Sequence, residues 1–369
     1  MPRSIQPDRW LFFATLALCL IGAVMVFSAS AVMAESTYHN AYGFFVRQLA
    51  AFLLGVAGMV ALARVDYHKL RQPAVIFTSL GLVLLALLAV LFLDRSHATH
   101  RWVRLGPASL QPSEFAKIAV VLYLAWFLEM RRQSNSHGVN DLLHTLAPAL
   151  GPVLALVLLV LLEPDMGTSM MIFLIALAML FEAGLSLRYA AAVLLAALPA
   201  IYLLIVRVPY RYNRLMAFLH PDSDPQGKGF QLLQSLIAVG SGGFSGVGLM
   251  GSRQKLFYLP EAHTDFIFAV LCEELGYLGG MVVLALFVIY GWRGIRTALA
   301  APDDFGRLLA LGVTVLVVGQ ALINLSVVLG MMPTKGIPLP FISYGGSSLV
   351  VMLVATGILL NISQYADQG

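Results

Sequence analysis

Long apolar runs separated by short polar segments dominate the pattern of hydrophobic and polar positions along the 369-residue chain. A transmembrane helix needs about 20 predominantly apolar residues, and such a run must be helical because lipid cannot satisfy open backbone groups. Windows of about 19 residues predict ten spans. They lie near residues 10–34, 43–64, 73–93, 115–130, 146–162, 168–184, 188–206, 264–291, 307–331 and 343–364. We therefore predict an all-α, polytopic membrane protein with one integral-membrane domain over residues 1–369.

The composition agrees with this class. Hydrophobic residues make up 59% of the chain and charged residues only 11%, whereas about a quarter of the residues in a soluble domain are charged. The net charge of +4 does not indicate a nucleic-acid partner, because the basic residues are scattered between apolar runs. The first run resembles a signal peptide but exceeds a usual signal-peptide core, so we predict a retained span, with a cleaved signal as the alternative.

Basic residues set the predicted orientation. An even number of spans puts both termini on one side, and the loops opposite, near 35–42 and 163–167, contain no Lys or Arg. By the positive-inside rule, both termini are cytoplasmic and residues 207–263 form a large extracytoplasmic segment between spans seven and eight. The basic residues on the cytoplasmic side are Arg3, Arg9, Arg64, Lys69, Arg71, Arg131, Arg132, Arg188, Arg293, Arg296 and Arg307.

Some basic residues fall on the predicted outer face instead. The short loop near 94–114 and the start of the next span carry Arg95, Arg101, Arg104 and Lys117. Such charge indicates either an anionic partner, a phosphate or a lipid headgroup, or contact with the headgroups of the membrane lipid itself. Both alternatives stay open at this point.

The segment "QPSEFAK", residues 111–117, begins the fourth span. Ser113 is a candidate N-cap, and Glu114 and Lys117 share one helix face because they are three residues apart. The alternative to a simple cap and surface ion pair is a polar pocket that includes Gln111. In "EPDMGTS", residues 163–169, Asp165 either caps the sixth span or has a functional role.

The external segment contains an apolar stretch, 230–251, that is too short to span a membrane. We predict a short helix on or in the outer leaflet, followed by a flexible Gly-rich loop whose N–H groups could hold phosphate oxygens.

Titratable residues are concentrated in "YLPEAHTDFIFAVLCEELG", residues 258–276. Thr264 or Asp265 is expected to cap the eighth span. An ionised acid at the centre of a membrane helix costs about 2.5–3.5 kcal/mol, so Glu273 is expected to face the same cavity as Asp265, about 80° away around the helix. Glu274 points the opposite way and needs a partner of its own.

The segment "PTKGIPLPFISYGGSS", residues 333–348, cannot be a continuous helix, and irregular backbone at this depth is tolerated where it lines a cavity. Its one basic residue is Lys335. Basic residues could hold a pyrophosphate while a carboxylate takes a proton from a sugar hydroxyl. The combination fits transfer from a lipid-linked sugar donor on the outer face, and it fits a flippase for such a lipid nearly as well.

Long blocks of the sequence resemble the signatures of the SEDS family, the bacterial shape, elongation, division and sporulation proteins, over essentially the whole chain. "PTKG" and "SRQKLFYLPEAHTDF" are most similar to the division branch, with the sporulation branch also close. The blocks are "RWVRLGPASLQPSEFAK", "EPDMGTS", "DPQGKGFQLLQS", "GSGG", "SRQKLFYLPEAHTDFIFAVLCEELG" and "GIPLPFISYGGSS".

The resemblance implies a ten-helix peptidoglycan glycosyltransferase. Such an enzyme polymerises lipid II into β-1,4 glycan strands on the outer face of the bacterial cytoplasmic membrane. It would work at the division septum with a class B penicillin-binding protein and other divisome membrane proteins. An elongation-type polymerase, a lipid II flippase and a non-catalytic divisome scaffold are the alternatives.

The resemblance also implies residue roles. Asp265, in "HTDF", is the expected general base on the acceptor hydroxyl, and Arg101, Lys117 and Lys335 are expected to hold the leaving pyrophosphate. A divalent cation, magnesium or manganese, is an open alternative, because no clustered metal-ligand spacing is visible. The expected substrate-binding residues are Arg101, Arg104, Gln111, Glu114, Lys117, Asp165, His263, Lys335 and Ser343.

Overall fold

The structure is a computed structural model that describes residues 6–93, 101–105, 108–134, 138–221, 224, 227, 229–256 and 258–366. The described chain is almost entirely helical, as predicted. Its elements are α1 (Arg9–Tyr38), α2 (Gly43–Arg64), the 3-10 helix η1 (Tyr67–Arg71), α3 (Pro73–Leu93), β1 (Val103–Leu105), β2 (Ala108–Leu110), α4 (Pro112–Ser134), the π-helix η2 (Leu142–Leu146), α5 (Ala147–Leu162), α6 (Met166–Glu182), α7 (Leu187–Val206), α8 (Pro209–Leu219), α9 (Phe230–Ser241), α10 (Ile267–Leu299), α11 (Asp304–Val328) and α12 (Gly346–Ser363).

Seven helices of the described chain are long and apolar enough to cross a membrane, which makes this a multi-pass membrane protein. Each of the ten predicted spans coincides with a helix, while α8 and α9 lie in the predicted external segment. The predicted short helix after residue 230 is therefore present as α9. The eighth span differs most, because α10 extends to Leu299 rather than residue 291. The number of spans and their orientation stay predictions.

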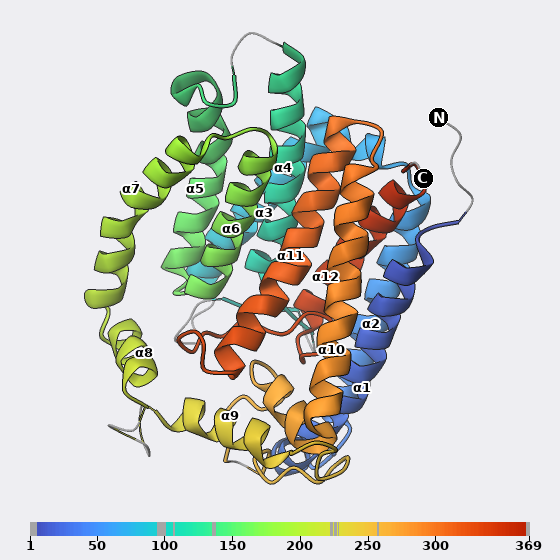
Figure 1. Cartoon of the computed structure of the whole chain (residues 1–369), viewed down its shortest axis with the longest axis vertical. Coiled ribbons are helices and arrows are strands. Elements are labelled where there is room, and N and C mark those ends of the chain that lie inside the picture. The colour runs from blue at the N-terminus through green and yellow to red at the C-terminus, as the bar shows by residue number, and fades with distance from the viewer. Residues whose placement is uncertain are drawn as a thin grey trace.

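The long helices stand side by side in one bundle (Figure 1). Helix α2 packs along α12, α1 and α11 pack against α10, and α4, α6 and α11 contact one another. Both termini lie at one end of the bundle, and α8 and α9 lie at the other (Figure 1). This separation agrees with the prediction that residues 207–263 and the termini are on opposite sides.

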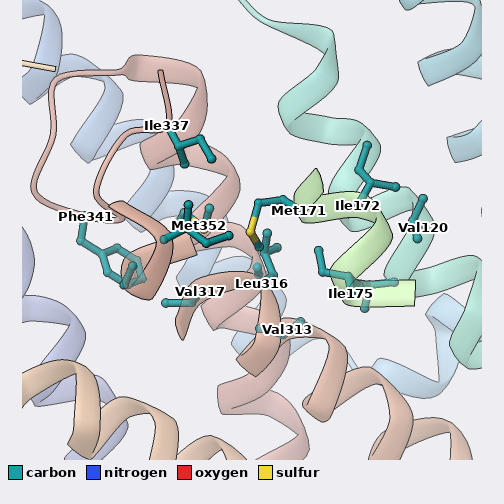
Figure 2. Packing of buried hydrophobic residues seen from close by; sticks show 14 of the residues in the cluster. Val120, Met171, Ile172, Ile175, Val313, Leu316, Val317, Ile337, Phe341 and Met352 are labelled. Atoms are coloured by element: carbon teal, nitrogen blue, oxygen red, sulfur yellow. The ribbon is translucent and has the colours of Figure 1, made fainter. Parts of the chain in front are cut away.

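Helix α12 lies at the centre of the bundle. In the most apolar stretch of α12, 83% of the residues are buried inside the protein. The corresponding share is 17% for α2, which covers α12 from outside. The two helices approach closely because α12 has a glycine at the contact: a Cβ at Gly357 would lie 2.5 Å from the carbonyl oxygen of Met59. Met352 of α12, Met171 of α6 and Leu316 of α11 meet in the adjoining core (Figure 2).

Helix α10 has a break at Gly276, where φ is 68°. The Gly-rich loop after α9 fills this break. The N–H of Val247 donates to the carbonyl of Glu273 and the N–H of Gly248 to that of Glu274, both at 3.0 Å. The prediction that this loop is flexible is therefore wrong, because its backbone pairs with α10. These two N–H groups are also no longer available to hold phosphate.

Glu273 does not face Asp265. Its carboxylate accepts hydrogen bonds from the hydroxyl of Ser252 and from the N–H of Arg253, the latter at 3.0 Å. The prediction that it lines the same cavity is wrong, because the break in α10 lets the external loop fold back over this carboxylate. Glu273 fixes the loop to the helix instead.

Glu274 has a partner that spacing along one helix could not reveal. It lies 2.7 Å from the Nζ of Lys255, and the side chains of the pair are 0% and 3% exposed. The hydroxyl of Ser28 on α1 also donates to this carboxylate, at 2.6–2.7 Å. A buried charge needs such pairing to avoid a large desolvation cost. The pair therefore joins the external loop, α10 and α1.

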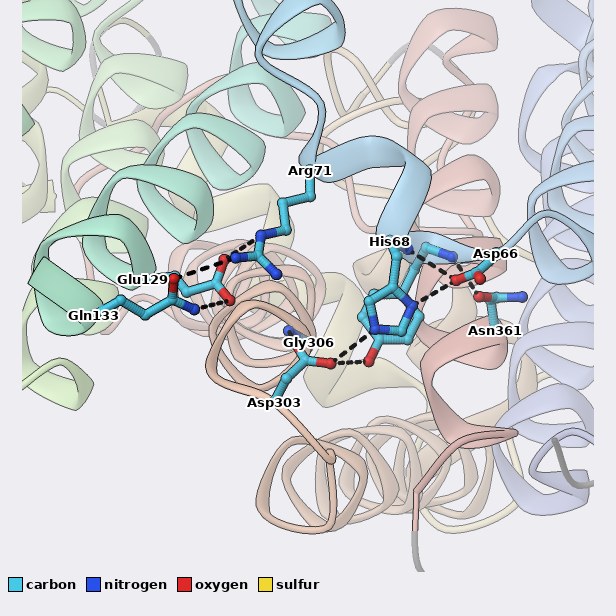
Figure 3. Close-up of polar contacts among 9 residues, drawn as sticks. Asp66, His68, Arg71, Glu129, Gln133, Asp303, Gly306 and Asn361 are labelled. Carbon is cyan, nitrogen blue, oxygen red and sulfur yellow. Dashed lines mark hydrogen bonds and ion pairs between the residues drawn. The ribbon is translucent and has the colours of Figure 1, made fainter. Parts of the chain in front are cut away.

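A polar network joins η1 to the neighbouring helices at the end of the bundle where the two termini lie (Figure 3). Arg71 of η1 forms an ion pair of 2.9 Å with Glu129 on α4. The hydroxyl of Tyr67 donates to Asp303, the N-cap residue of α11. The N–H of Tyr67 donates to Asn361 of α12 at 2.9 Å. These contacts fix the terminal end, far from α8 and α9.

The docked Gly-rich loop generates a prediction about stability. Gly246 and Gly248 have φ values of 82° and 93°, so alanine is strained at either position. A Cβ at Gly246 would also overlap the carbonyl of Glu274, whereas nothing lies within 4 Å of one at Gly248. We expect Gly246→Ala to destabilise the protein by about 1–3 kcal/mol more than Gly248→Ala. Thermal unfolding of the two purified variants measures the difference, and equal midpoints would contradict the docking.

Candidate functional site

Asp265 lies just before α10, which begins at Ile267. The N-cap position is Phe266 and no side chain caps the helix. The prediction that Thr264 or Asp265 caps this helix is therefore wrong. A tight turn, in which the N–H of Phe266 donates to the carbonyl of Glu261 at 3.2 Å, precedes the helix and displaces its start. The hydroxyl of Thr264 donates to the Glu261 carboxylate at 2.8 Å, and the Asp265 carboxylate is left out of capping.

The half-buried Asp265 carboxyl has a mixed electrostatic environment. Desolvation by burial, followed by the negative charge of Glu261, raises its pKa to about 7, while Arg214 opposes the shift. The negative charge of Asp165 also raises the pKa of this carboxyl, and the positive charge of Arg101 lowers it, both with smaller effects. A carboxyl with a pKa near neutrality is suited to accept a proton at physiological pH.

The irregular segment between α11 and α12 forms one side of the site. The Nδ2 of Asn324 on α11 donates to the carbonyls of Asp265, at 2.8 Å, and Ile337, at 2.7 Å. Gln320, one turn earlier, donates to the carbonyl of Pro338 at 2.9 Å. Gly336 lies so close to Asp265 that a Cβ there would be 3.0 Å from Oδ2. Two side chains of α11 thus position this loop against Asp265.

Ser343 and His263 lie in the same region with structural contacts. The hydroxyl of Ser343 donates to the carbonyl of Thr264 at 2.6 Å and accepts from the N–H of Leu339 at 2.7 Å. The His263 ring packs 4.9 Å from the ring of Phe44, and burial lowers its pKa. Both contacts therefore hold the segment that directly precedes Asp265.

Asp165 and Gln111 are joined directly. Asp165 caps α6, which is one of the two alternatives predicted for it, with its carboxylate accepting from the N–H of Thr168 at 3.0 Å. It also accepts from the Nε2 of Gln111 at 3.0 Å. Helix α4 begins at Pro112, so its N-cap position is Gln111, and the prediction of Ser113 is wrong. Proline is favoured at the first helical position, which places the cap one residue earlier.

Arg101 contacts the turn between α5 and α6. Its Nε donates to the carbonyl of Glu163 at 2.9 Å, and its guanidinium also donates to Pro164. Arg104 lies in β1, paired with Ser109 of β2, and its side chain is outside the described part of the structure.

Glu163 belongs to the site but was not predicted from the sequence. Its side chain is buried, and neither carboxyl oxygen has a hydrogen-bond partner among the described residues. Burial and then the charge of Asp165 raise its pKa to about 8. A buried carboxyl without donors is held mainly in its protonated, neutral form at pH 7.

Glu114 and Lys117 form the predicted ion pair at 2.9 Å, but not on the surface. Their side chains are 3% and 1% exposed. The Lys117 ammonium also donates to Oε1 of Gln320 at 2.7 Å, and Oε2 of Glu114 has no partner in the described chain. The pair therefore supports Gln320, which in turn supports the loop beside Asp265.

Lys335 differs from Lys117 because its ammonium lies against sulfur. Its Nζ is 3.0 Å from Sδ of Met170 on α6. Among the described residues it forms no ion pair, and burial lowers its pKa. Of the basic side chains described in this region, Lys335 is the one best able to accept a new anionic partner.

Gln320, Asn324 and Arg214 also belong to the site but were not predicted. Polar residues one turn apart in the otherwise apolar α11 are the signal that could have found the first two. Arg214 carries no local signal, because only the fold brings α8 beside the loop, where its guanidinium donates to the carbonyl of Thr334 at 3.1 Å.

An apolar groove of about 370 Å³ leads to this polar cluster. It runs between α3, α4 and α12 and is lined by residues such as Leu82, Phe115 and Val351. Leu110 and Pro112 line the groove, and Gln111 lies between them in the sequence. A molecule with an apolar tail and a polar, anionic head would fit both parts.

The described residues contain no group of three or more His, Cys, Asp or Glu side chains that could hold a metal ion. The protein side chains described here therefore do not form a metal cage by themselves.

The chain is similar to known proteins along nearly its whole length. The chain is 43% identical over 362 residues to the probable peptidoglycan glycosyltransferase FtsW of Trichlorobacter lovleyi, covering 98% of this chain and 94% of that protein. It is 42% identical to stage V sporulation protein E of Bacillus subtilis, covering 99% of both.

Solved structures show the same fold. A peptidoglycan synthase complex that coordinates polymerization and crosslinking contains a chain that matches with a TM-score of 0.79 and 31% identity, over 99% of this chain and 100% of that one. The rod shape determining protein RodA of Thermus thermophilus matches with a TM-score of 0.71 and 28% identity, over 99% of both chains. The family of cell cycle proteins that comprises FtsW, RodA and SpoVE matches residues 9–368, and this chain belongs to that family.

Proposed function

We propose that this protein is a peptidoglycan glycosyltransferase that polymerises lipid II on the outer face of the bacterial cytoplasmic membrane. The observation that carries the proposal is the placement of Asp265. Its carboxyl is left out of helix capping and has a pKa near 7. It lies two residues before α10, whose other end contacts the start of α1 through Arg293 and Asp8. The similarity to peptidoglycan glycosyltransferase FtsW proteins supports the same reaction.

In the proposed reaction, Asp265 acts as a general base on the 4-hydroxyl of an N-acetylglucosamine acceptor. The hydroxyl oxygen attacks the anomeric carbon of the N-acetylmuramic acid donor, and its proton passes to the carboxylate. The bond between that carbon and the pyrophosphate oxygen breaks, and the bonding electrons leave with undecaprenyl pyrophosphate. The α-linked donor becomes a β-1,4 product, so the configuration inverts.

The surrounding residues have complementary roles in this proposal. The groove between α3, α4 and α12 receives the undecaprenyl chain, whose apolar surface matches its lining. Lys335, which lacks an ion pair among the described residues, and Arg101 contact the pyrophosphate. Lys117 is already paired with Glu114, so it acts on the site through Gln320.

A divalent cation enters the proposal only together with the substrate. Magnesium is commonly bound by one or two carboxylates plus substrate phosphates, and the described side chains form no metal cage alone. Asp165 and Glu163 are the residues that would hold such an ion, and Glu163 would have to lose its proton to do so. The ion would neutralise charge on the leaving pyrophosphate.

The comparisons support a partner and a cellular role. The match to a peptidoglycan synthase complex supports a class B penicillin-binding protein as partner. The proposal places this pair among other divisome membrane proteins. The division role at the septum is favoured by the FtsW relatives, and the equally similar sporulation protein makes that branch the nearest alternative.

Removal of the proposed base tests the mechanism. Asp265→Asn should lower the rate of lipid II polymerisation by about 10²–10⁴-fold, because general base catalysis contributes that much. Glu261→Gln, at an exposed carboxylate four residues earlier, is the matched control and should keep most of the activity. Glycan products from fluorescent lipid II, with the transpeptidase partner present, are measured on gels. Polymerisation by Asp265→Asn at the wild-type rate would exclude this role. A flippase would be favoured if the wild type had no polymerase activity and Asp265→Asn lost the transbilayer movement of lipid II.

The raised pKa of Asp265 predicts the pH dependence. Because the base must be deprotonated, kcat/KM should fall about tenfold per pH unit below about pH 7. Glu261→Gln removes a neighbouring negative charge that raises this pKa, so its acidic limb should move to lower pH. Polymerisation rates between pH 5.5 and 8.5 measure both profiles. An unshifted limb in Glu261→Gln would assign the titration to another group.

Lys335 provides a separate test of pyrophosphate binding. Lys335→Gln should reduce kcat/KM for lipid II by about 10–100-fold, the range expected for a charge-assisted hydrogen bond, and Lys335→Arg should restore part of it. Lys69→Gln, at the opposite end of the bundle, is the control. If the glutamine variant bound and polymerised lipid II as the wild type does, the pyrophosphate would have to be held elsewhere.

A further inference from the structure

A second pocket, of about 360 Å³, lies at the terminal end of the bundle. The start of α1, the last turns of α10 and the end of α12 form it, and we name it the α1–α10 pocket. Its described lining contains the arginines Arg9, Arg293 and Arg296 and one carboxylate, Asp8, which gives a formal charge of +2. Asp265 precedes the opposite end of α10, so this pocket is separate from the proposed active site.

The described lining of the pocket carries more positive than negative charge, and two of its arginines are exposed. The carboxylate of Asp8 accepts from the N–H of Leu11 at 3.0 Å as the cap of α1, and it also forms an ion pair with Arg293. The guanidinium of Arg9 donates to the neutral amide of Gln6. Arg9 and Arg296 are both exposed. Asp8, the one carboxylate of the described lining, therefore serves both as a helix cap and as the ion-pair partner of Arg293.

The surroundings of the pocket are those of a membrane interface. Trp10, which lines it, is 63% exposed, and Phe13 beside it is 60% exposed. A neighbouring apolar depression shares Pro7 and Arg9 with the pocket and is lined by Phe12 and Phe13. Tryptophan is typical of the level of lipid headgroups, and the apolar depression offers a surface for acyl chains.

We propose that the α1–α10 pocket binds the phosphate of an anionic phospholipid from the leaflet on the side of the termini, which the charge distribution predicts to be the cytoplasmic leaflet. Arginine pairs with phosphate through two parallel hydrogen bonds, and basic pockets between helix ends attract anionic headgroups. The adjoining exposed aromatic surface distinguishes a lipid from a free phosphate ion, which would leave that surface uncovered.

Native mass spectrometry of the full-length protein in neutral detergent tests the proposal. Phosphatidylglycerol is titrated as the probe, with phosphatidylcholine as the neutral comparison. We expect the anionic lipid to bind more tightly, and Arg9→Gln with Arg296→Gln to weaken it by about fivefold per arginine removed. Arg188→Gln, at the exposed start of α7 at the same end of the bundle, is the matched control and should bind normally.

Inorganic phosphate and glycerol 3-phosphate are added as soluble competitors of the lipid. Both should compete only at concentrations far above that of the lipid, because they lack acyl chains. Equal affinity of the wild type for the two lipids, or unchanged affinity of the double variant, would overturn the proposal. Competition by inorganic phosphate at the concentration of the lipid would also overturn it, in favour of a phosphate ion site. The comparison of the two lipids uses only the wild-type protein, so it tests the proposal even if the double variant does not fold.

Discussion

The site depends on the hydrogen bonding of irregular backbone inside a helical bundle. The segment between α11 and α12 cannot bond to itself as a helix does, so its carbonyls need donors from elsewhere. Gln320 and Asn324 supply them, and Asn324 also holds the carbonyl of Asp265. Because Asn324 bonds both the loop and the backbone of Asp265, the position of Asp265 is coupled to α11 and to the loop that follows it.

Charged residues in this protein fall into two groups. Glu114 with Lys117 and Glu274 with Lys255 are buried ion pairs, whose charges are compensated and whose effect is to fix neighbouring segments. Asp265, Glu163 and Lys335 lack such pairing among the described residues, and the pKa values of all three are shifted by burial. Uncompensated burial is costly, so it persists where a substrate can later supply the missing charge or proton.

Helix α10 connects the two ends of the molecule. At one end it begins two residues after Asp265, and near that end its break at Gly276 receives the Gly-rich loop. At the other end Arg293 and Arg296 line the α1–α10 pocket. The external loop and the start of α1 are both attached to this helix, through Lys255 and Asp8. Helix α10, with its break at Gly276, thus joins the proposed catalytic residue to the proposed lipid site.

The sequence by itself determined the all-helical membrane class and the position of each long helix, because apolar length and period are local properties. It also placed Glu114 beside Lys117 and Asp165 at a cap, since residues three apart on a helix meet without any tertiary information. Only the tertiary structure decided the partners of Glu273 and Glu274, the docking of the Gly-rich loop, and the contributions of Arg214 and Glu163. Those contacts join segments far apart in the chain or depend on burial by neighbouring helices, and neither is encoded in local spacing.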